Sequence, residues 1–182
     1  MIEIRIHGRG GQGAVIASKI LACAFFSEDY YVQAFPKFGV ERRGAPVEAF
    51  LRIDRQKILL RNNIYTPDHI IVLDHTLIEA TDVTAGLKEG GWIITNAPDK
   101  PAHLARLKGY KIACVDANQI AAKFRLGSRS APIVNTAILG GFAKATGLVK
   151  LDSITTAIRG EVPIKASENA EAATEAYQNT II

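Results

Sequence analysis

The stretch IHGRGGQGAVIASKILA, residues 6–22, decides the fold. It joins a β-branched run to an apolar segment with helical spacing, and four of the six residues from Gly8 to Gly13 are glycines. Glycines permit positive φ and close backbone approach, and a helix that starts after them presents free N–H groups to an anion. The stretch therefore predicts a strand, a glycine-rich turn and a helix. The turn is interpreted either as a ligand contact or as a tight strand–helix connection.

Strands and helices alternate along the rest of the chain. Strands are predicted at residues 2–7, 30–35, 47–53, 69–74, 90–96 and 110–116, and helices at 14–26, 117–124, 132–146, 151–159 and 166–178. The loop before residue 47 is too short for a helix, so at least one antiparallel pairing is expected. The pattern predicts an α/β fold, a three-layer α/β/α Rossmann-like domain with a mostly parallel sheet, formed by residues 1–182 as one domain. Close packing against another element is the expected reason for the Gly140-Gly141 pair inside a helix.

Composition limits the classes of function. The 182 residues carry a net charge of +4 with Lys and Arg scattered, which does not favour nucleic-acid binding. No apolar stretch is long enough to cross a bilayer, and Glu3, Arg5 and His7 interrupt any signal-like run. The only cysteines, Cys23 and Cys114, exclude an iron–sulfur or zinc site held by this chain alone, and no metal site is expected. A cytoplasmic protein is expected.

The glycines at 8, 10 and 13 match the dinucleotide fingerprint G-x-G-x-x-G. A dinucleotide site also needs an acid at the end of the second strand, to hold the ribose hydroxyls. Here Glu28 and Asp29 precede that strand, which ends at Phe35-Pro36-Lys37. No Lys-Ser or Lys-Thr follows the glycines at the distance that a phosphate-binding P-loop requires. The residues therefore argue against both nucleotide motifs.

Three segments carry a resemblance to a known family. IRIHGRGGQGAVIASKILA, FPKFGVERRGAPVEAFLRID and APIVNTAILGGFAKATGLV together resemble the gamma subunit of the 2-oxoacid:ferredoxin oxidoreductases, in the right order and as far as about Pro163. The segment ERRGAPV, residues 41–47, is more similar to the pyruvate branch of the family than to the 2-oxoglutarate branch. Branched-chain enzymes, such as those acting on 2-oxoisovalerate, resemble the pyruvate type here, so that branch stays open.

The resemblance implies a subunit with no catalytic residue and no cofactor of its own. In this family a 2-oxoacid is decarboxylated on thiamine diphosphate with Mg²⁺, and electrons pass through [4Fe–4S] clusters to ferredoxin. The acyl group is transferred to coenzyme A, and the reaction can also run as pyruvate synthesis. The resemblance places the thiamine site and the clusters on partner subunits of the alpha, beta and delta types. The gamma chain completes the assembly and helps shape the space that coenzyme A approaches.

Candidate residues for contact with coenzyme A, another anion or a partner subunit cluster in three segments. Arginine forks suit phosphate and carboxylate partners, whereas exposed arginines on a lone chain are only solvated. Asn135 is expected one turn inside a helix, where it bonds either a neighbouring loop or a ligand. Asp74-His75 lacks a visible third partner, which argues against a catalytic dyad. The candidates are Gly8, Arg9, Gly10, Gly11, Gln12, Gly13, Arg42, Arg43, Gly44 and Asn135.

Two other classes of function remain as alternatives. One is a free-standing nucleotide-dependent oxidoreductase, which would hold a dinucleotide in the purified chain. The other is a binding or regulatory module that senses an anionic metabolite outside any enzyme complex. Co-purification of native partners distinguishes the three.

Overall fold

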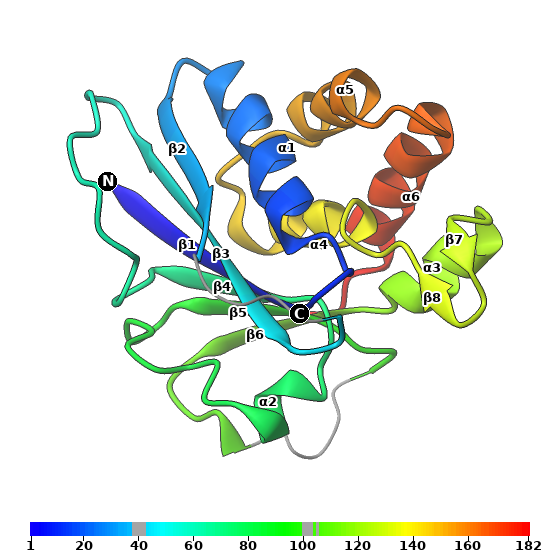
Figure 1. The fold of residues 1–182 in the computed structure, drawn as a ribbon, viewed down its shortest axis with the longest axis horizontal. Coiled ribbons are helices and arrows are strands. Elements are labelled where there is room, and N and C mark those ends of the chain that lie inside the picture. The colour runs from blue at the N-terminus through cyan, green and yellow to red at the C-terminus, as the bar shows by residue number, and fades with distance from the viewer. Residues whose placement is uncertain (38–42, 100–103, 105) are drawn as a thin grey trace.

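The computed structural model describes residues 1–37, 43–99, 104 and 106–182. These residues form a six-stranded sheet in the order β2-β3-β1-β4-β5-β6. The strands are β1 (Ile2–Arg9), β2 (Tyr31–Pro36), β3 (Pro46–Asp54), β4 (His69–Val72), β5 (Trp92–Asn96) and β6 (Lys111–Val115). Figure 1 shows the sheet with helices packed above it.

Strand direction in the sheet is mixed, as predicted. β4 pairs parallel with β1, and β5 and β6 continue in parallel register. β3 runs antiparallel to both of its neighbours, β1 and β2. The short loop before β3 explains this reversal, because a parallel return needs a crossover of a dozen or more residues. The predicted α/β fold class is confirmed.

One face of the sheet is covered by helices α1 (Ala14–Phe26), α4 (Ala137–Thr146), α5 (Leu151–Glu161) and α6 (Ala166–Asn179). Ile4 and Ile6 of β1 point toward this layer and are fully buried with the apolar side chains of α1. A Cβ added to Gly140 of α4 would overlap the carbonyl oxygen of Ala173 in α6. The predicted close packing of the glycine pair is therefore confirmed at Gly140.

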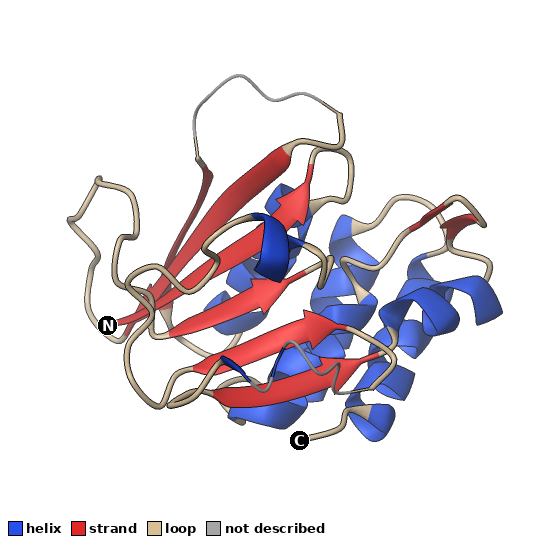
Figure 2. Cartoon of the chain, turned by 90° about the horizontal axis from the view of Figure 1, so that it is seen from below, coloured by secondary structure: helices blue, strands red, loops and turns tan. Residues whose placement is uncertain are grey.

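The opposite face carries a thinner layer. Its helix is the short α2 (Leu77–Ala80), joined by irregular segments, and Figure 2 shows it on the far side of the sheet from the large helices. Ile70, Val72 and Ile93 form the apolar cluster under this layer. None of the helices in the described residues is both long and apolar enough to span a membrane.

The segment before α4 departs from the sequence prediction. The helix predicted at 132–146 begins only at Ala137, and Pro132 instead ends a hairpin of β7 (Gly127–Ser128) and β8 (Ala131–Pro132). The hairpin follows α3 (Ala117–Lys123) directly. Pro132 fits both a helix start and an edge strand, and the pairing of Gly127 with Pro132 decided between them. Asn135 consequently lies outside the helix, one residue before its N-cap Thr136.

Candidate functional site

A groove of about 960 Å³ opens at the carboxyl end of the sheet. In open α/β sheets ligands bind at this edge, where strand ends and helix N-termini converge. The glycine loop after β1 forms one wall, the ends of β4 and β5 form the floor, and the segment between β8 and α4 forms the other wall. Its volume falls at the upper end of the range for small-molecule sites, about 300–1,000 Å³.

The glycine loop, residues 8–13, is built by backbone conformations that favour glycine. Gly11 and Gly13 have φ of 95° and 80°. A Cβ on Gly13 would also overlap the Asn135 side-chain nitrogen. The Gln12 side-chain oxygen accepts a hydrogen bond from the Arg9 backbone N–H at 2.7 Å, which holds the turn closed. The loop thus brings main chain, rather than bulky side chains, to the wall of the groove.

Helix α1 starts at this loop without a side-chain cap. Gly13 is its N-cap, in the left-handed region, and within the described residues the cap makes no side-chain hydrogen bond to the first turn. The first N–H groups of a helix have no intrahelical partner, and the helix dipole favours negative charge beside them. The start of α1 therefore offers donors to an anion in the groove.

Arg9 is tied to the end of β4 rather than free in solvent. Its Nε donates to the Asp74 carboxylate at 2.8 Å, and its Nη2 donates to Thr76 Oγ1 at 2.9 Å. Asp74 also accepts hydrogen bonds from the Thr76 backbone N–H and hydroxyl. Partial burial tends to raise the Asp74 pKa, but the bonds from Thr76 and Arg9 outweigh it, so the pKa lies below its ordinary value. Asp74 is thus a charge partner that clamps the loop, and a poor base.

The segment before β3 lies against the glycine loop. Gly10 donates to the Ala45 carbonyl at 2.8 Å, and the Gly44 N–H donates to the Gly10 carbonyl at 3.0 Å. These bonds bring the exposed Arg43 side chain to the groove, where no ion pair neutralises it within the described residues. Arg42 lies outside the described residues.

Asn135 lies in the opposite wall of the groove and donates a hydrogen bond to the neighbouring glycine loop. This agrees with the first of the two interpretations of Asn135 that the sequence offered. Asn135 is 4% exposed, and its Nδ2 donates to the Gly13 carbonyl at 3.3 Å. Because the nitrogen must face that carbonyl, the oxygen Oδ1 points elsewhere, and it has no hydrogen-bond partner among the residues that the structure describes. Asn135 therefore links the glycine loop to the segment before α4.

The groove brings together most of the candidates named from the sequence. Gly8 is the exception among those described, because it lies inside β1, where an added Cβ would come within 3.1 Å of Leu73. Candidates that line the groove are Arg9, Gly10, Gly11, Gln12, Gly13, Arg43, Gly44 and Asn135.

Sequence reasoning missed two kinds of lining residue, apolar side chains at the rim and an asparagine of α3. Ile16 and Ile133 add exposed apolar side chains at the rim. Asn118 was missed although it follows a strand end by three residues, a signal that the carboxyl-edge rule would have found. Asn96 lies at the end of β5 and also lines the groove; its Nδ2 donates to the Leu73 carbonyl at 3.0 Å, and its Oδ1 accepts from the Ala117 N–H.

His7 and the two cysteines are side chains of the types that serve acid–base or metal chemistry. Burial, with the charges of Arg5 and Lys37, lowers the pKa of His7 to about 3, so this histidine is neutral near pH 7. Cys23 lies on α1 and Cys114 on β6, whereas a [4Fe–4S] cluster takes four thiolates. Within the described residues no group of His, Cys, Asp or Glu is arranged to hold a metal ion. The donor set of this chain does not fit an iron–sulfur cluster.

Comparison with known proteins gives a consistent relationship. The family model described as pyruvate ferredoxin/flavodoxin oxidoreductase matches residues 3–179. The chain is 56% identical to the "Pyruvate/ketoisovalerate oxidoreductases common subunit gamma" of Pyrococcus abyssi, over 100% of this chain and 98% of that protein. It is 50% identical to "Pyruvate synthase subunit PorC" of Methanocaldococcus jannaschii, over 100% of this chain and 98% of that protein.

A solved structure resembles this chain in both fold and sequence. The crystal structure of pyruvate oxidoreductase subunit PORC from Thermotoga maritima superimposes with a TM-score of 0.82 at 34% identity, over 99% of this chain and 97% of that one. The family match and the two relatives at 50% identity or more leave no other assignment. This chain belongs to the pyruvate ferredoxin/flavodoxin oxidoreductase family, among its gamma-type subunits.

Proposed function

We propose that the chain acts as the gamma subunit of a cytoplasmic complex that oxidises pyruvate to acetyl-coenzyme A and passes the electrons to ferredoxin. Thiamine diphosphate, Mg²⁺ and the [4Fe–4S] clusters reside on partners of the alpha, beta and delta types. One observation carries the proposal. The groove offers backbone donors and Arg43 to an anion, while its carboxylate, Asp74, is already engaged by Arg9 and Thr76. Such a site binds and positions a ligand, and the partners supply the chemistry.

Coenzyme A is the ligand that this groove suits. Its pyrophosphate binds to the N–H donors at the start of α1 and to the Arg43 guanidinium, since the paired N–H donors of arginine match phosphate oxygens. The aliphatic parts of its pantetheine arm suit the exposed Ile16 and Ile133 on the rim. Asn135 holds the glycine loop in place for this contact. The acyl group itself is delivered by the partner that carries thiamine diphosphate.

We propose that the same chain is also the gamma subunit of a complex that oxidises a second 2-oxoacid, 2-oxoisovalerate. The Pyrococcus abyssi relative carries both pyruvate and ketoisovalerate in its name, as a common subunit. A gamma subunit that contacts coenzyme A and not the 2-oxoacid can be shared, because both reactions use the same acyl acceptor. Choice of substrate then belongs to the partner subunits.

A nucleotide-dependent oxidoreductase is the weaker alternative. In the dinucleotide fold the second strand lies beside the first, so that its terminal acid reaches the ribose. Here β3 lies between β1 and β2. An acid at the end of β2 would be one strand too far from the glycine loop, and the strand ends at Pro36.

Reconstitution tests the proposal. The partners from the same organism are assembled with and without this chain, and pyruvate-dependent ferredoxin reduction is measured while coenzyme A is varied. The chain alone should show no activity and contain no iron, flavin or thiamine diphosphate. With the partners it should be required for turnover that depends on coenzyme A. A complex that lacks the chain and still works at the full rate would refute the proposal.

A further inference from the structure

We propose that a second groove, lined by Arg125 and Arg129, binds a phosphomonoester at the far end of the ligand in the first groove. The inference rests on the proposed function, because coenzyme A carries such a group, the 3′-phosphate of its ribose, away from its pyrophosphate. Neither arginine is among the candidates named from the sequence: Arg125 lies between α3 and β7, and Arg129 lies in the turn between β7 and β8.

The second groove continues the first. It has a volume of about 770 Å³ and is lined by α3, by the residues that follow it and by the hairpin. Asn118 and Pro132 line both grooves, so the two share a boundary. Figure 1 shows α3 and the hairpin together at one side of the molecule, beside α6. A ligand that enters at the glycine loop can therefore extend past Asn118 toward the hairpin.

The two arginines leave positive charge in this groove. Within the described residues neither Arg125 nor Arg129 has an ion pair or a side-chain hydrogen bond, and both are exposed. Lys123 at the end of α3 differs, since Glu175 of α6 accepts from its ammonium group at 2.6 Å. Lys165 is engaged as well, because its ammonium donates to the Arg125 carbonyl at 2.7 Å. The positive charge available to a ligand is therefore that of the two guanidinium groups.

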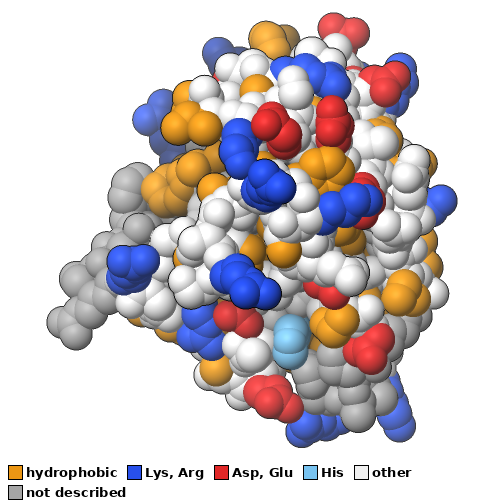
Figure 3. All heavy atoms as spheres, turned by 90° about the vertical axis from the view of Figure 1, so that its right-hand side faces the viewer, with side chains coloured by type: hydrophobic (Ala, Val, Ile, Leu, Met, Phe, Trp, Pro, Cys, Tyr) orange, Lys and Arg blue, Asp and Glu red, His pale blue; other side chains and the backbone are white. Residues whose placement is uncertain are grey.

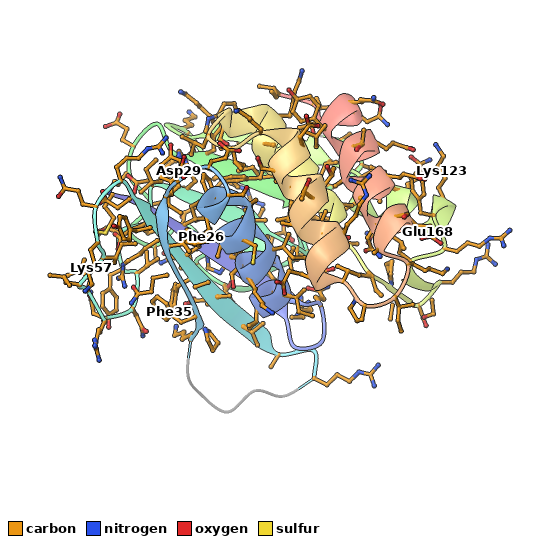
Figure 4. All side chains as sticks on the ribbon, turned by 90° about the horizontal axis from the view of Figure 1, so that it is seen from above. Phe26, Asp29, Phe35, Lys57, Lys123 and Glu168 are labelled. Atoms are coloured by element: carbon orange, nitrogen blue, oxygen red, sulfur yellow. The ribbon has the colours of Figure 1, made fainter. Side chains whose placement is uncertain are left out.

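Acidic side chains also lie on this side of the molecule. Figure 3 looks onto it and shows Lys and Arg side chains across its middle with Asp and Glu among them. Figure 4 labels Lys123 and Glu168, which lie on this same side. Asp116 caps the start of α3, where its carboxylate accepts from the Gln119 N–H. None of these carboxylates lines the second groove in the part of the chain that the structure describes.

The backbone around the arginines is held in unusual conformations. Arg125 and Lys165 both have positive φ, 54° and 55°, and the hydrogen bond from Lys165 joins them. Gly127 has φ of 80°, and a Cβ there would overlap the Ala131 carbonyl oxygen. Ser128 Oγ accepts from the Ala131 N–H at 3.1 Å, which closes the hairpin. The loop that carries the arginines is thus fixed on both sides, which reduces the ordering needed on binding.

The donor types favour a phosphomonoester over other anions. Each guanidinium presents a planar fork of N–H donors that fits two phosphate oxygens, and a dianionic phosphate has three oxygens for two forks. The Ser128 and Ser130 hydroxyls, 3.2 Å apart, lie on the same hairpin. A carboxylate has only two oxygens and one charge, so it would satisfy one arginine.

Coenzyme A and dephospho-coenzyme A differ only in the 3′-phosphate, so this pair of substrates tests the inference. Apparent Michaelis constants for both are measured in the reconstituted complex with the parent chain, Arg125→Gln, Arg129→Gln and the double variant. Arg159→Gln is the control, since Arg159 is exposed on α5 and lines neither groove. Arg129 lies in an exposed hairpin turn, so Arg129→Gln gives a folded test protein even if Arg125→Gln does not.

The parent should prefer coenzyme A by about tenfold or more, because each charge-assisted hydrogen bond contributes a factor of this order. Each single variant should lose part of the preference and the double variant nearly all of it, with the constant for dephospho-coenzyme A unchanged. A parent without preference, or a double variant that keeps the parental preference, would overturn the inference. Either result leaves the proposed function intact if the chain is still required for turnover, whereas dispensability of the chain refutes that function itself.

Discussion

The two faces of the sheet are stabilised by different chemistry. Toward α1, α4, α5 and α6 the strands present Ile4, Ile6 and other fully buried apolar side chains. On the opposite face β4 and β5 carry an apolar cluster, but β1 and β3 present Arg5, His7 and Arg52, which are buried and polar; this part is called the polar face. Because of this difference, the stability of each face should respond to a different kind of change. Apolar packing responds to volume, whereas the polar face responds to charge and to pH.

The polar face satisfies its charges internally. Arg52 is 0% exposed; its Nε donates to the Glu3 carboxylate at 2.8 Å and its Nη1 to the Gln33 side-chain oxygen at 3.0 Å. Arg5 donates through Nη2 to the Ala85 carbonyl at 2.7 Å and through Nε to His7 Nε2 at 3.0 Å. A buried charge persists only when hydrogen bonds replace its hydration. These residues join β1 and β3 to the irregular segments over this face.

The largest effect is expected on the helical face, at Gly140. Gly140→Ala would place a methyl group against the backbone carbonyl of Ala173, which cannot move without separating α4 from α6. The expected loss is about 3 kcal/mol in the free energy of unfolding, the upper part of the range for overpacked cores. Denaturant unfolding of the purified chain measures it.

Gly141→Ala is the matched control. Its nearest neighbour would be the Thr180 hydroxyl at 3.2 Å, the end of a side chain that can adjust. Alanine also has the better helix propensity, by about 1 kcal/mol, so this variant should stay within about 1 kcal/mol of the parent. Equal losses at the two positions would show that close contact of α4 and α6 is not the cause.

The next effect concerns the polar face. Arg52→Met leaves the Glu3 carboxylate and the Gln33 oxygen without their donor. Because the Glu3 side chain is still 14% exposed, the expected loss is about 2 kcal/mol, below the cost of breaking a fully buried pair. Arg55→Met is the control, since Arg55 lies over the Tyr30 ring on the surface, and exposed cation–π contacts contribute about 0.5–1 kcal/mol. Urea midpoints of the two variants provide the comparison. Similar midpoints would mean that burial of Arg52 contributes little.

A smaller effect is expected when pH is lowered. The His7 pKa falls from 6.5 to about 3 on folding, so the unfolded chain binds more protons between these values. The contribution of neutral His7 is complete above pH 6.5 and is lost as pH falls toward 3, at no more than about 1.4 kcal/mol per pH unit. Unfolding free energies measured from pH 7 to pH 5 test this sign.

His7→Gln should flatten that slope. Burial also lowers the pKa of His69, which acts in the same direction, so His69→Gln should remove only a part. Carboxylates such as Asp74 have lowered pKa values and lose their contribution at more acidic pH. A slope that is unchanged in His7→Gln would assign the pH dependence to other groups.

The smallest effect on stability is expected at the groove, which belongs to neither face. Arg43 is exposed and unpaired within the described residues, so Arg43→Ala should leave the melting temperature of the chain nearly unchanged. Against a partner subunit or an anion the same change removes about 2–5 kcal/mol of binding, and it should weaken assembly or raise the apparent Michaelis constant for coenzyme A. Thermal melting is compared with reconstitution titrated with coenzyme A. If the variant assembles and turns over like the parent, Arg43 contacts neither a partner subunit nor coenzyme A and is only solvated.

Local sequence patterns determined much of this fold. The helix predicted at 14–26 coincides with α1, and the six strands of the sheet and the helices α3, α5 and α6 lie within a few residues of prediction, because their apolar periodicity is read over short distances. The short helix α2 and the strands β7 and β8 were not predicted. Gly147 ends α4 with φ of 63°, as expected of a glycine C-cap. The glycine loop, Asp74 and Asn96 lie at one edge because parallel strands of a sheet end together.

Other features depended on contacts between residues far apart in sequence. Helix α4 begins at residue 137 and not at the predicted residue 132, because Pro132 pairs with Gly127 in a hairpin. Asp74 became a partner of Arg9, 65 residues away, and Asn135 a partner of Gly13, 122 residues away. The second groove exists only because that hairpin folds back beside α3. Propensity and periodicity are local, so the sequence by itself determined the elements and their order, whereas tertiary packing decided which polar groups meet at the site.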